Sequence, residues 1–483
     1  MEDRKSSLKL KAKKYEYVPP DGGWGYLVAI SAIICFSTTT SFSGSFGIMF
    51  NEFINEVSMS SASVTLLSGI YSLAIAFTGF FTSALLSIMS MRWLAFTASV
   101  IFAFGTFGAV IMTTPFMFFL TAGVLQGAGL GILYNLSCTI INDYFVEKRI
   151  LIMSFVQTAT GVNAMVAPMV VRWSIEQYGS RGTILLVAGL SLHNFIAVLL
   201  MQPVRWHMKR LEVPEKAELK ILLEENNDFK KLDTPVIKLT DFELNTKEGL
   251  EKAFEVPEKK KSGIRKVLDS IIDPSLLRTY VLSGAALGTS MCCNADGIHT
   301  IMAPQYLYAM NWSNENVAMA ITLYGFGDLA TRILFTMIYK WMNKIGVKNM
   351  YIIGAAIAAI ARLGMLWSSS VIPIMVFFTV IGVAHCFIVV LLPLVISETV
   401  APDKFTSAMG ISCLLTGTSS LAVGPAIGAV RDYTQSYSVA FYILTLMFAI
   451  VVILWPIELI IKNRRRKTME NNLKSSQVNK GFN

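Results

Sequence analysis

Long apolar stretches alternate with short polar segments along the whole chain. Stretches that contain no Asp, Glu, Lys or Arg include 22–51, 57–91, 93–142, 150–171, 182–204, 279–295, 363–397, 405–430 and 433–457. A helix needs about 20 apolar residues to cross a membrane. We therefore divide 93–142 into two spans at Thr113-Thr114-Pro115, and 363–397 at Ser368-Ser369-Ser370. The pattern predicts six membrane spans before residue 203 and six after residue 275, if the segment 316–339, which has only two charged residues, is counted as one of the latter.

Residues at a constant separation indicate that the two sets of spans are related. Ser60 and Tyr71 recur as Ser313 and Tyr324, both 253 residues later. Such a repeat is typical of transporters that bind their solute between the two halves, near the middle of the membrane. We therefore predict an all-α membrane protein with twelve transmembrane helices in two pseudo-symmetric six-helix bundles.

The polar segments set the expected boundaries of the chain's parts. We expect a basic cytoplasmic tail at 1–22, an N-terminal six-helix bundle at 23–202, a cytoplasmic linker loop at 203–275, a C-terminal six-helix bundle at 276–461 and a second basic tail at 462–483. The linker mixes acidic and basic residues with few aromatic ones, a composition typical of disordered segments.

Composition and charge agree with a membrane protein of defined orientation. Only 15% of the 483 residues are charged, against about 25% in soluble domains. Lys and Arg gather in both tails and in the linker, whereas the opposite side has only Arg172, Arg181 and Arg431. The positive-inside rule then places both termini and the linker in the cytoplasm. The net charge of +9 reflects this topology, so it indicates the lipid bilayer and no nucleic acid as a partner.

Asp328 and Arg332 are the most informative residues because they are the only charged residues between Asn316 and Tyr339. Charged side chains inside a membrane span are costly and are usually functional. Their i, i+4 spacing places both on one helix face. At the repeat offset, the first half has Ile75 and Gly79 in their places, which favours a specialised role. A substrate or proton site is one interpretation, and a buried structural ion pair is the other.

Further candidates each have a functional and a structural interpretation. Tyr71 and Tyr324 either line the cavity from both halves or pack as ordinary aromatic residues. His385 is either a proton relay or a histidine bonded to a neighbouring helix. Asp296 and His299 form either a helix-end pair or part of an outer vestibule.

The remaining charged candidates lie near span ends. Arg362 either neutralises an acid or reaches the outer interface. Lys148 and Arg149 either follow the positive-inside rule or form a gate with Asp143 or Glu147. The sequence has no metal-ligand spacing and no nucleophile–base arrangement, so we expect neither a cofactor nor catalysis.

Three motifs connect the chain to a known family. The run Asp21-Gly22-Gly23-Trp24-Gly25-Tyr26 precedes span one, Tyr144-Phe145-Val146-Glu147-Lys148-Arg149 precedes span five with Gly161 after it, and span eight contains Asp328-Leu329-Ala330-Thr331-Arg332. Together they resemble the signatures of the monocarboxylate transporter family within the major facilitator superfamily.

The resemblance implies a plasma-membrane carrier of small organic acids or related solutes that works by alternating access, in many members with a proton. It implies that Arg332 pairs with the substrate carboxylate, that Asp328 holds Arg332 in the empty site, and that Tyr71 lies beside the substrate. Asp328 and His385 are then the candidates for proton coupling. Several family members need a single-span glycoprotein partner to reach the cell surface.

The chain departs from the family pattern at residues that matter for substrate choice. Gly44 stands where proton-coupled members have a lysine in span one, Ile333 replaces a proline, and Glu147 replaces a basic residue. Loss of the lysine removes a cation that attracts an anion. A proton-independent facilitator of aromatic or zwitterionic solutes is therefore a rival prediction. A non-transporting sensor or scaffold is a further alternative.

Overall fold

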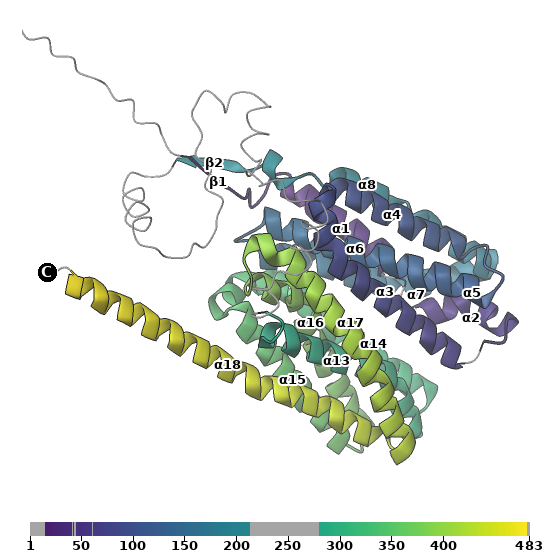
Figure 1. Cartoon of the computed structure of the whole chain (residues 1–483). Helices are drawn as coiled ribbons and strands as arrows, with labels where there is room; N and C mark the ends of the chain where they lie inside the picture. The colour runs from purple at the N-terminus through teal and green to yellow at the C-terminus, as the bar shows by residue number, and fades with distance from the viewer. Residues whose placement is uncertain (1–14, 41, 43–44, 60, 213–279, 481–483) are drawn as a thin grey trace, which may run out of the picture.

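The computed structural model describes residues 15–40, 42, 45–59, 61–212 and 280–480, and this part of the chain is helical apart from two short strands (Figure 1). The helices of the first half are α1 (Gly25–Thr39), α2 (Phe46–Glu56), α3 (Ser61–Ile88), α4 (Met91–Gly108), α5 (Pro115–Phe118), the π-helical η2 (Phe119–Leu125), α6 (Gln126–Tyr144), α7 (Arg149–Ser191) and α8 (His193–Leu200). Those of the second half are the π-helical η4 (Gly284–Gly288), α13 (Thr289–Ala309), α14 (Asn314–Ile345), α15 (Val347–Trp367), α16 (Val371–Ser397), the short η5 (Pro402–Lys404), α17 (Phe405–Thr434) and α18 (Tyr437–Lys480).

Twelve crossings can be followed through these helices. Nine segments in the described residues are long and apolar enough to span a membrane. One of them, Arg149–Leu200, has 52 residues and turns at Gly179, whose φ of 71° suits glycine, so it crosses twice. The α1–α2 segment and the η4–α13 segment supply the remaining two. The predicted twelve-helix fold is confirmed, with span one broken between α1 and α2.

Local sequence explains where several helices begin. Ser90 and Ser313 cap α4 and α14 by accepting hydrogen bonds from the backbone N–H groups of Trp93 and Asn316. Thr114 caps α5 in the same way, and Pro115 fills the first helical position, where no N–H is needed. The turn at Thr114 divides the apolar stretch 93–142 at the point that the sequence analysis predicts.

The two halves meet along two helix pairs. α3 of the first half packs along α17 of the second, and α7 packs along α14 (Figure 1). Because α3 corresponds to α14 and α7 to α17 in the sequence repeat, the two contacts are related by pseudo-twofold symmetry. Gly417 allows close packing at one of them, since a Cβ at this position would collide with that of Ala76.

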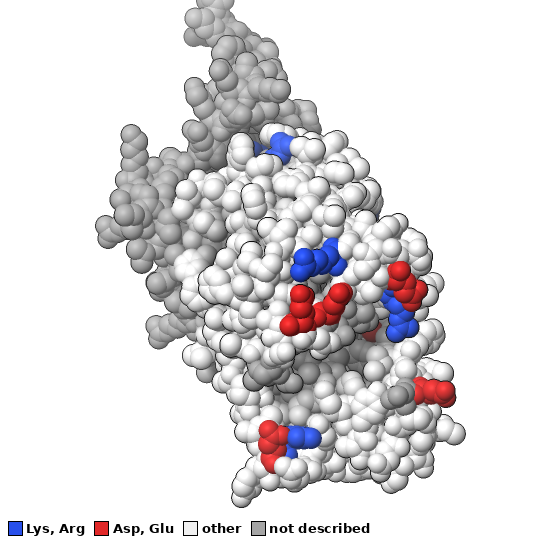
Figure 2. Space-filling view, turned by 90° about the vertical axis from the view of Figure 1, so that its right-hand side faces the viewer, with Lys and Arg blue, Asp and Glu red and all other residues white. Residues whose placement is uncertain are grey.

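One end of the molecule carries the start of the linker, and we call it the linker end. There the halves are joined by hydrogen bonds between Ser83 and Ser407 (2.6 Å), between Thr139 and Thr406 (3.0 Å), and from Arg149 to Ser397 (3.1 Å). The surface at the opposite end is hollowed between the halves and has few charged side chains (Figure 2). The structure is therefore closed at the linker end.

A small sheet at the linker end was not predicted. Strand β1 (Tyr15–Val18) in the N-terminal tail pairs antiparallel with β2 (Lys209–Glu212) in the first residues of the linker. Strand β2 follows the single-turn helix η3 (Val204–Trp206). The sheet ties the N-terminal tail to the linker, while the rest of the predicted linker, residues 213–275, lies outside the described residues.

Candidate functional site

The charged pair of α14 forms as its spacing indicates. Arg332 Nε donates a hydrogen bond to Asp328 Oδ2 at 2.9 Å. The side chains of Arg332 and Asp328 are only 7% and 15% exposed. The second carboxylate oxygen, Asp328 Oδ1, is buried without a hydrogen-bond partner in the described part of the chain. The ion pair is thus almost excluded from water, and Asp328 Oδ1 is left able to accept one more hydrogen bond.

Arg332 also reaches the other half of the molecule. Its Nη1 donates to the backbone oxygen of Gln157 on α7 at 3.1 Å and to the Gln157 side-chain Oε1 at 3.2 Å. Gly161 makes room for the arginine, because a Cβ there would lie 3.3 Å from Arg332 Cδ. One guanidinium therefore connects Asp328 in the second half to α7 in the first.

A second buried cluster lies within the C-terminal half. Arg362 Nη2 donates to Asp296 Oδ1 at 2.6 Å, and His385 Nδ1 lies 2.5 Å from Asp296 Oδ2. Arg362 is fully buried and its guanidinium lies 4.5 Å from the centre of the Phe448 ring. Arg362 therefore neutralises an acid, Asp296, which is one of its two predicted interpretations.

The expected helix-end pair of Asp296 and His299 does not form. Asp296 lies in the interior of α13 and bonds to Arg362 and His385 instead, while both ring nitrogens of His299 are buried without a hydrogen-bond partner in the described residues. The hydropathy pattern placed Asp296 near a span end because the charge itself ends the apolar stretch 279–295.

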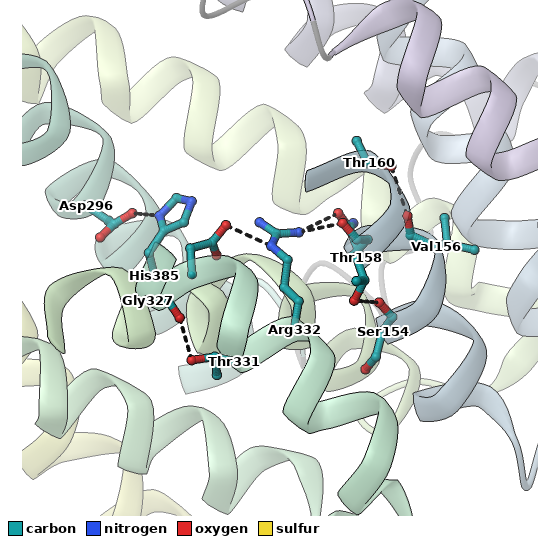
Figure 3. Close-up of polar contacts among 11 residues, drawn as sticks. Ser154, Val156, Thr158, Thr160, Asp296, Gly327, Thr331, Arg332 and His385 are labelled. Carbon is teal, nitrogen blue, oxygen red and sulfur yellow. Dashed lines mark hydrogen bonds and ion pairs between the residues drawn. The ribbon is translucent and has the colours of Figure 1, made fainter. Parts of the chain in front are cut away.

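Figure 3 shows Asp296, His385 and Arg332 in one row that leads toward α7. His385 lies within electrostatic range of both Asp328 and Arg332. The Tyr324 ring lies 5.5 Å from the His385 ring, and its hydroxyl is 3.4 Å from Thr300 Oγ1. Three of the candidate residues, Tyr324, Asp328 and Arg332, are thus brought together with His385.

Tyr71 lies in a different environment. It lines a cavity of about 280 Å³ inside the N-terminal half, together with Phe46, Phe50, Phe102 and Gln126. No described contact joins Tyr71 to the charged residues of α14. The two tyrosines of the repeat therefore occupy two different surroundings. Gly44, which stands where the family has a lysine, is outside the described residues.

The three gating candidates lie at the linker end. Arg149 donates to Ser397 of the other half and to the backbone oxygens of Asn142 and Phe145. Lys148 Nζ lies 3.4 Å from the Tyr26 hydroxyl within its own half. Asp143 is half-buried and within electrostatic range of Arg149. Of these three residues, only Arg149 makes a described hydrogen bond across the halves.

The first two sequence motifs contact each other at this end. Asp21 Oδ1 accepts hydrogen bonds from the backbone N–H groups of Val146 at 2.8 Å and Glu147 at 3.1 Å. Gly25 packs on Phe145, since a Cβ there would lie 2.7 Å from Phe145 Cζ. The carboxylate and the glycine of the first motif thus fix the turn that begins α7.

Sequence reasoning missed two parts of the site. It did not join Asp296 to Arg362, although each is a charged residue that interrupts an apolar stretch, and this interruption was the available signal. No feature of the sequence distinguished Gln157 from the other polar residues of the spans. Among the described residues, no group of three or more His, Cys, Asp or Glu side chains is placed to hold a metal ion.

Comparisons with known proteins agree with the resemblance. The family model described as Major Facilitator Superfamily matches residues 28–283 and 285–481. Monocarboxylate transporter 1 of Bos taurus is 24% identical over 441 residues, covering 88% of this chain and 83% of the relative. Monocarboxylate transporter 12 of Mus musculus is 24% identical over 467 residues, covering 95% and 90%. The predicted resemblance to this family is confirmed.

Solved structures share the fold at low sequence identity. The proton:xylose symporter XylE, bound to a bromodeoxyglucose, has a TM-score of 0.60 at 15% identity and covers 89% of this chain and 94% of its own. FucP in its outward conformation also has a TM-score of 0.60, at 14% identity, and covers 90% and 98%. Because the family model matches most of its length, the chain belongs to the Major Facilitator Superfamily and is a multi-pass membrane transporter.

Proposed function

We propose that the protein carries small monocarboxylates or related organic solutes across the plasma membrane by alternating access, with Arg332 binding the solute carboxylate. The observation that supports this most is the position of the guanidinium, which is buried near the middle of α14 and bonded to both halves. A planar guanidinium matches a carboxylate with two parallel hydrogen bonds. The transport-protein relatives point to the same class of solute.

The geometry suggests how binding leads to movement. A solute carboxylate that bonds to Arg332 competes with Asp328 Oδ2 and with the Gln157 oxygens. Because Gln157 belongs to α7, weakening its bonds changes the contact between α7 and α14. Release of the Arg149–Ser397 bond then opens the linker end. Arg149 is the proposed gate, and Lys148 and Asp143 are proposed to support it.

The orientation of the transporter follows from its basic residues. We place both termini and the linker in the cytoplasm, so the closed linker end is cytoplasmic and the hollowed end of Figure 2 faces outward. Large apolar side chains such as Phe104 and Met337 are exposed on the helix surfaces and would contact lipid. A single-span glycoprotein partner for surface delivery is proposed from the family resemblance alone.

A proton-independent facilitator of aromatic or zwitterionic solutes is the second candidate. Gly44 in place of the family lysine favours it, as does the aromatic lining of the cavity that contains Tyr71. The family assignment favours either form of transport over a sensor or scaffold.

Uptake into proteoliposomes separates the candidates. The purified protein is tested with radiolabelled L-lactate, pyruvate, benzoate and phenylalanine, with and without a pH gradient. Uptake of acids supports the first proposal, and uptake of phenylalanine without any effect of pH supports the second. Arg332→Ala should abolish acid uptake while folded protein remains. Loss of the folded protein alone would instead support a structural ion pair, because a buried charge without its partner costs about 3–5 kcal/mol.

A further inference from the structure

The two buried clusters form one network around His385. The charged or titratable side chains that interact with its ring come from two helices: Asp296 from α13, and Tyr324, Asp328 and Arg332 from α14. Arg362 from α15 and Cys293 from α13 interact with Asp296. The neighbouring α7 contributes the uncharged Gln157. His385 is 24% exposed on its side chain, whereas Asp296 and Arg362 are 4% and 0% exposed. The imidazole is therefore the part of its cluster that water can reach.

The hydrogen bonds determine which ring nitrogen is free. An ionised carboxylate only accepts hydrogen bonds, so the His385 Nδ1 that lies 2.5 Å from Asp296 Oδ2 carries a hydrogen. Arg362 bonds to the other oxygen of the same carboxylate, and a guanidinium stays protonated in proteins, so Asp296 remains ionised. The remaining nitrogen, Nε2, is left as a proton acceptor.

The charges of the network balance in pairs when His385 is neutral. Arg362 compensates Asp296, and Arg332 compensates Asp328. A solute carboxylate that takes Arg332 leaves Asp328 without its counter-ion, and Asp328 Oδ1 already lacks a hydrogen-bond partner in the described residues. One proton on His385 restores neutrality, because uncompensated charge in a nearly dry site is costly.

We propose that His385 takes up one proton for each solute carboxylate bound at Arg332, with Asp296 and Arg362 as positioning residues that hold the imidazole. Nε2 accepts the proton from water on one side of the membrane and releases it to water on the other, so no other bond forms or breaks. This inference rests on the proposed function. It locates coupling entirely in the C-terminal half, away from the span-one position that is Gly44 here.

Two transport modes of the full-length protein in proteoliposomes test the proposal. One is accumulation of radiolabelled L-lactate, pyruvate or benzoate driven by a pH gradient, and the other is equilibrium exchange of the same acid at equal pH. His385→Gln should reduce gradient-driven accumulation at least tenfold, and the equilibrium exchange that remains should no longer depend on pH, because the variant has no group at this position to take up the compensating proton. His193→Gln is the matched control, because His193 is exposed in the other half and bonds only to Leu190 among the described residues; it should behave as wild type.

A double variant tests the positioning role. Asp296→Asn with Arg362→Leu removes both buried charges, so neither is left uncompensated. The double variant should lower the pH of half-maximal uptake by about one unit, because it lacks the carboxylate that favours the protonated form of His385. Full gradient-driven accumulation by His385→Gln would overturn the proposal. So would acid uptake by the wild type that ignores the pH gradient, although the proposed function would stand. If none of the three acids moves, the proposed function fails and this inference fails with it.

Discussion

Replacing Arg332 with lysine tests whether carboxylate binding depends on the planar geometry of the guanidinium or only on its positive charge. In the structure Arg332 uses Nε for Asp328 and Nη1 for both Gln157 oxygens, at 2.9, 3.1 and 3.2 Å. A lysine keeps the positive charge and a bond to Asp328, but it is a single point donor that cannot bind a carboxylate through two parallel bonds.

The size of the effect follows from the bond that is lost. A hydrogen bond to a charged group contributes about 1.5–3 kcal/mol. Since about 1.4 kcal/mol corresponds to a factor of ten in affinity, Arg332→Lys should raise the half-saturating concentration of a transported acid by roughly 10- to 150-fold. The fold should be little affected, because the ion pair with Asp328 is retained.

The assay is concentration-dependent uptake of a transported acid into proteoliposomes, with the amount of folded protein measured by size-exclusion chromatography. Arg92→Lys is the matched control, because Arg92 lies at the linker end beside Trp206 and away from the site. A half-saturating concentration for Arg332→Lys within twofold of wild type would refute the carboxylate-binding role of the guanidinium.

Three further predictions concern packing, the motif contact and the ion pair. Gly382→Ala should lower the thermal midpoint of the detergent-purified protein, since the new methyl would collide with the backbone of Tyr324 and overpacking costs about 1–3 kcal/mol. Gly424→Ala should leave the midpoint unchanged, since its new methyl would meet none of the described residues within 4 Å. Asp21→Ala should destabilise the protein by about 1–3 kcal/mol, because two strong backbone donors lose their acceptor; an unchanged denaturation midpoint would contradict this. Exchanging the charges, Asp328→Arg with Arg332→Asp, should give a folded protein that does not transport acids. Acid uptake by this double variant would show that the pair is only structural.

The fold could be predicted because it depends on local patterns. Apolar length and polar turns such as Thr113-Thr114-Pro115 are read directly from neighbouring residues. The break in span one was missed because the residues between α1 and α2 contain no charge. At the end of α1, the hydroxyls of Thr38, Thr39 and Thr40 donate hydrogen bonds to backbone oxygens one turn earlier. Such side-chain bonds compete with the regular hydrogen bonds of a helix.

The contacts of the site could be predicted only where the two interacting residues are close in sequence. Asp328 and Arg332 are four residues apart, so helical geometry alone brings them together. Asp296 lies 66 residues from Arg362 and 89 from His385, and Gln157 lies 175 from Arg332. Which helix faces which at these separations depends on the packing of the whole bundle. The same reason explains why the pairing of β1 with β2 was not foreseen.

Binding of organic acids and their amides tests the central role of Arg332 most directly. L-lactate, benzoate and phenylalanine are each compared with the corresponding amide by their effect on the thermal midpoint of the purified protein, since a ligand of the folded state raises it. The account predicts that at least one acid raises the midpoint, that its amide does not, and that Arg332→Gln removes the response. An amide that stabilises the wild type as well as its acid, or a response that survives in Arg332→Gln, would contradict it.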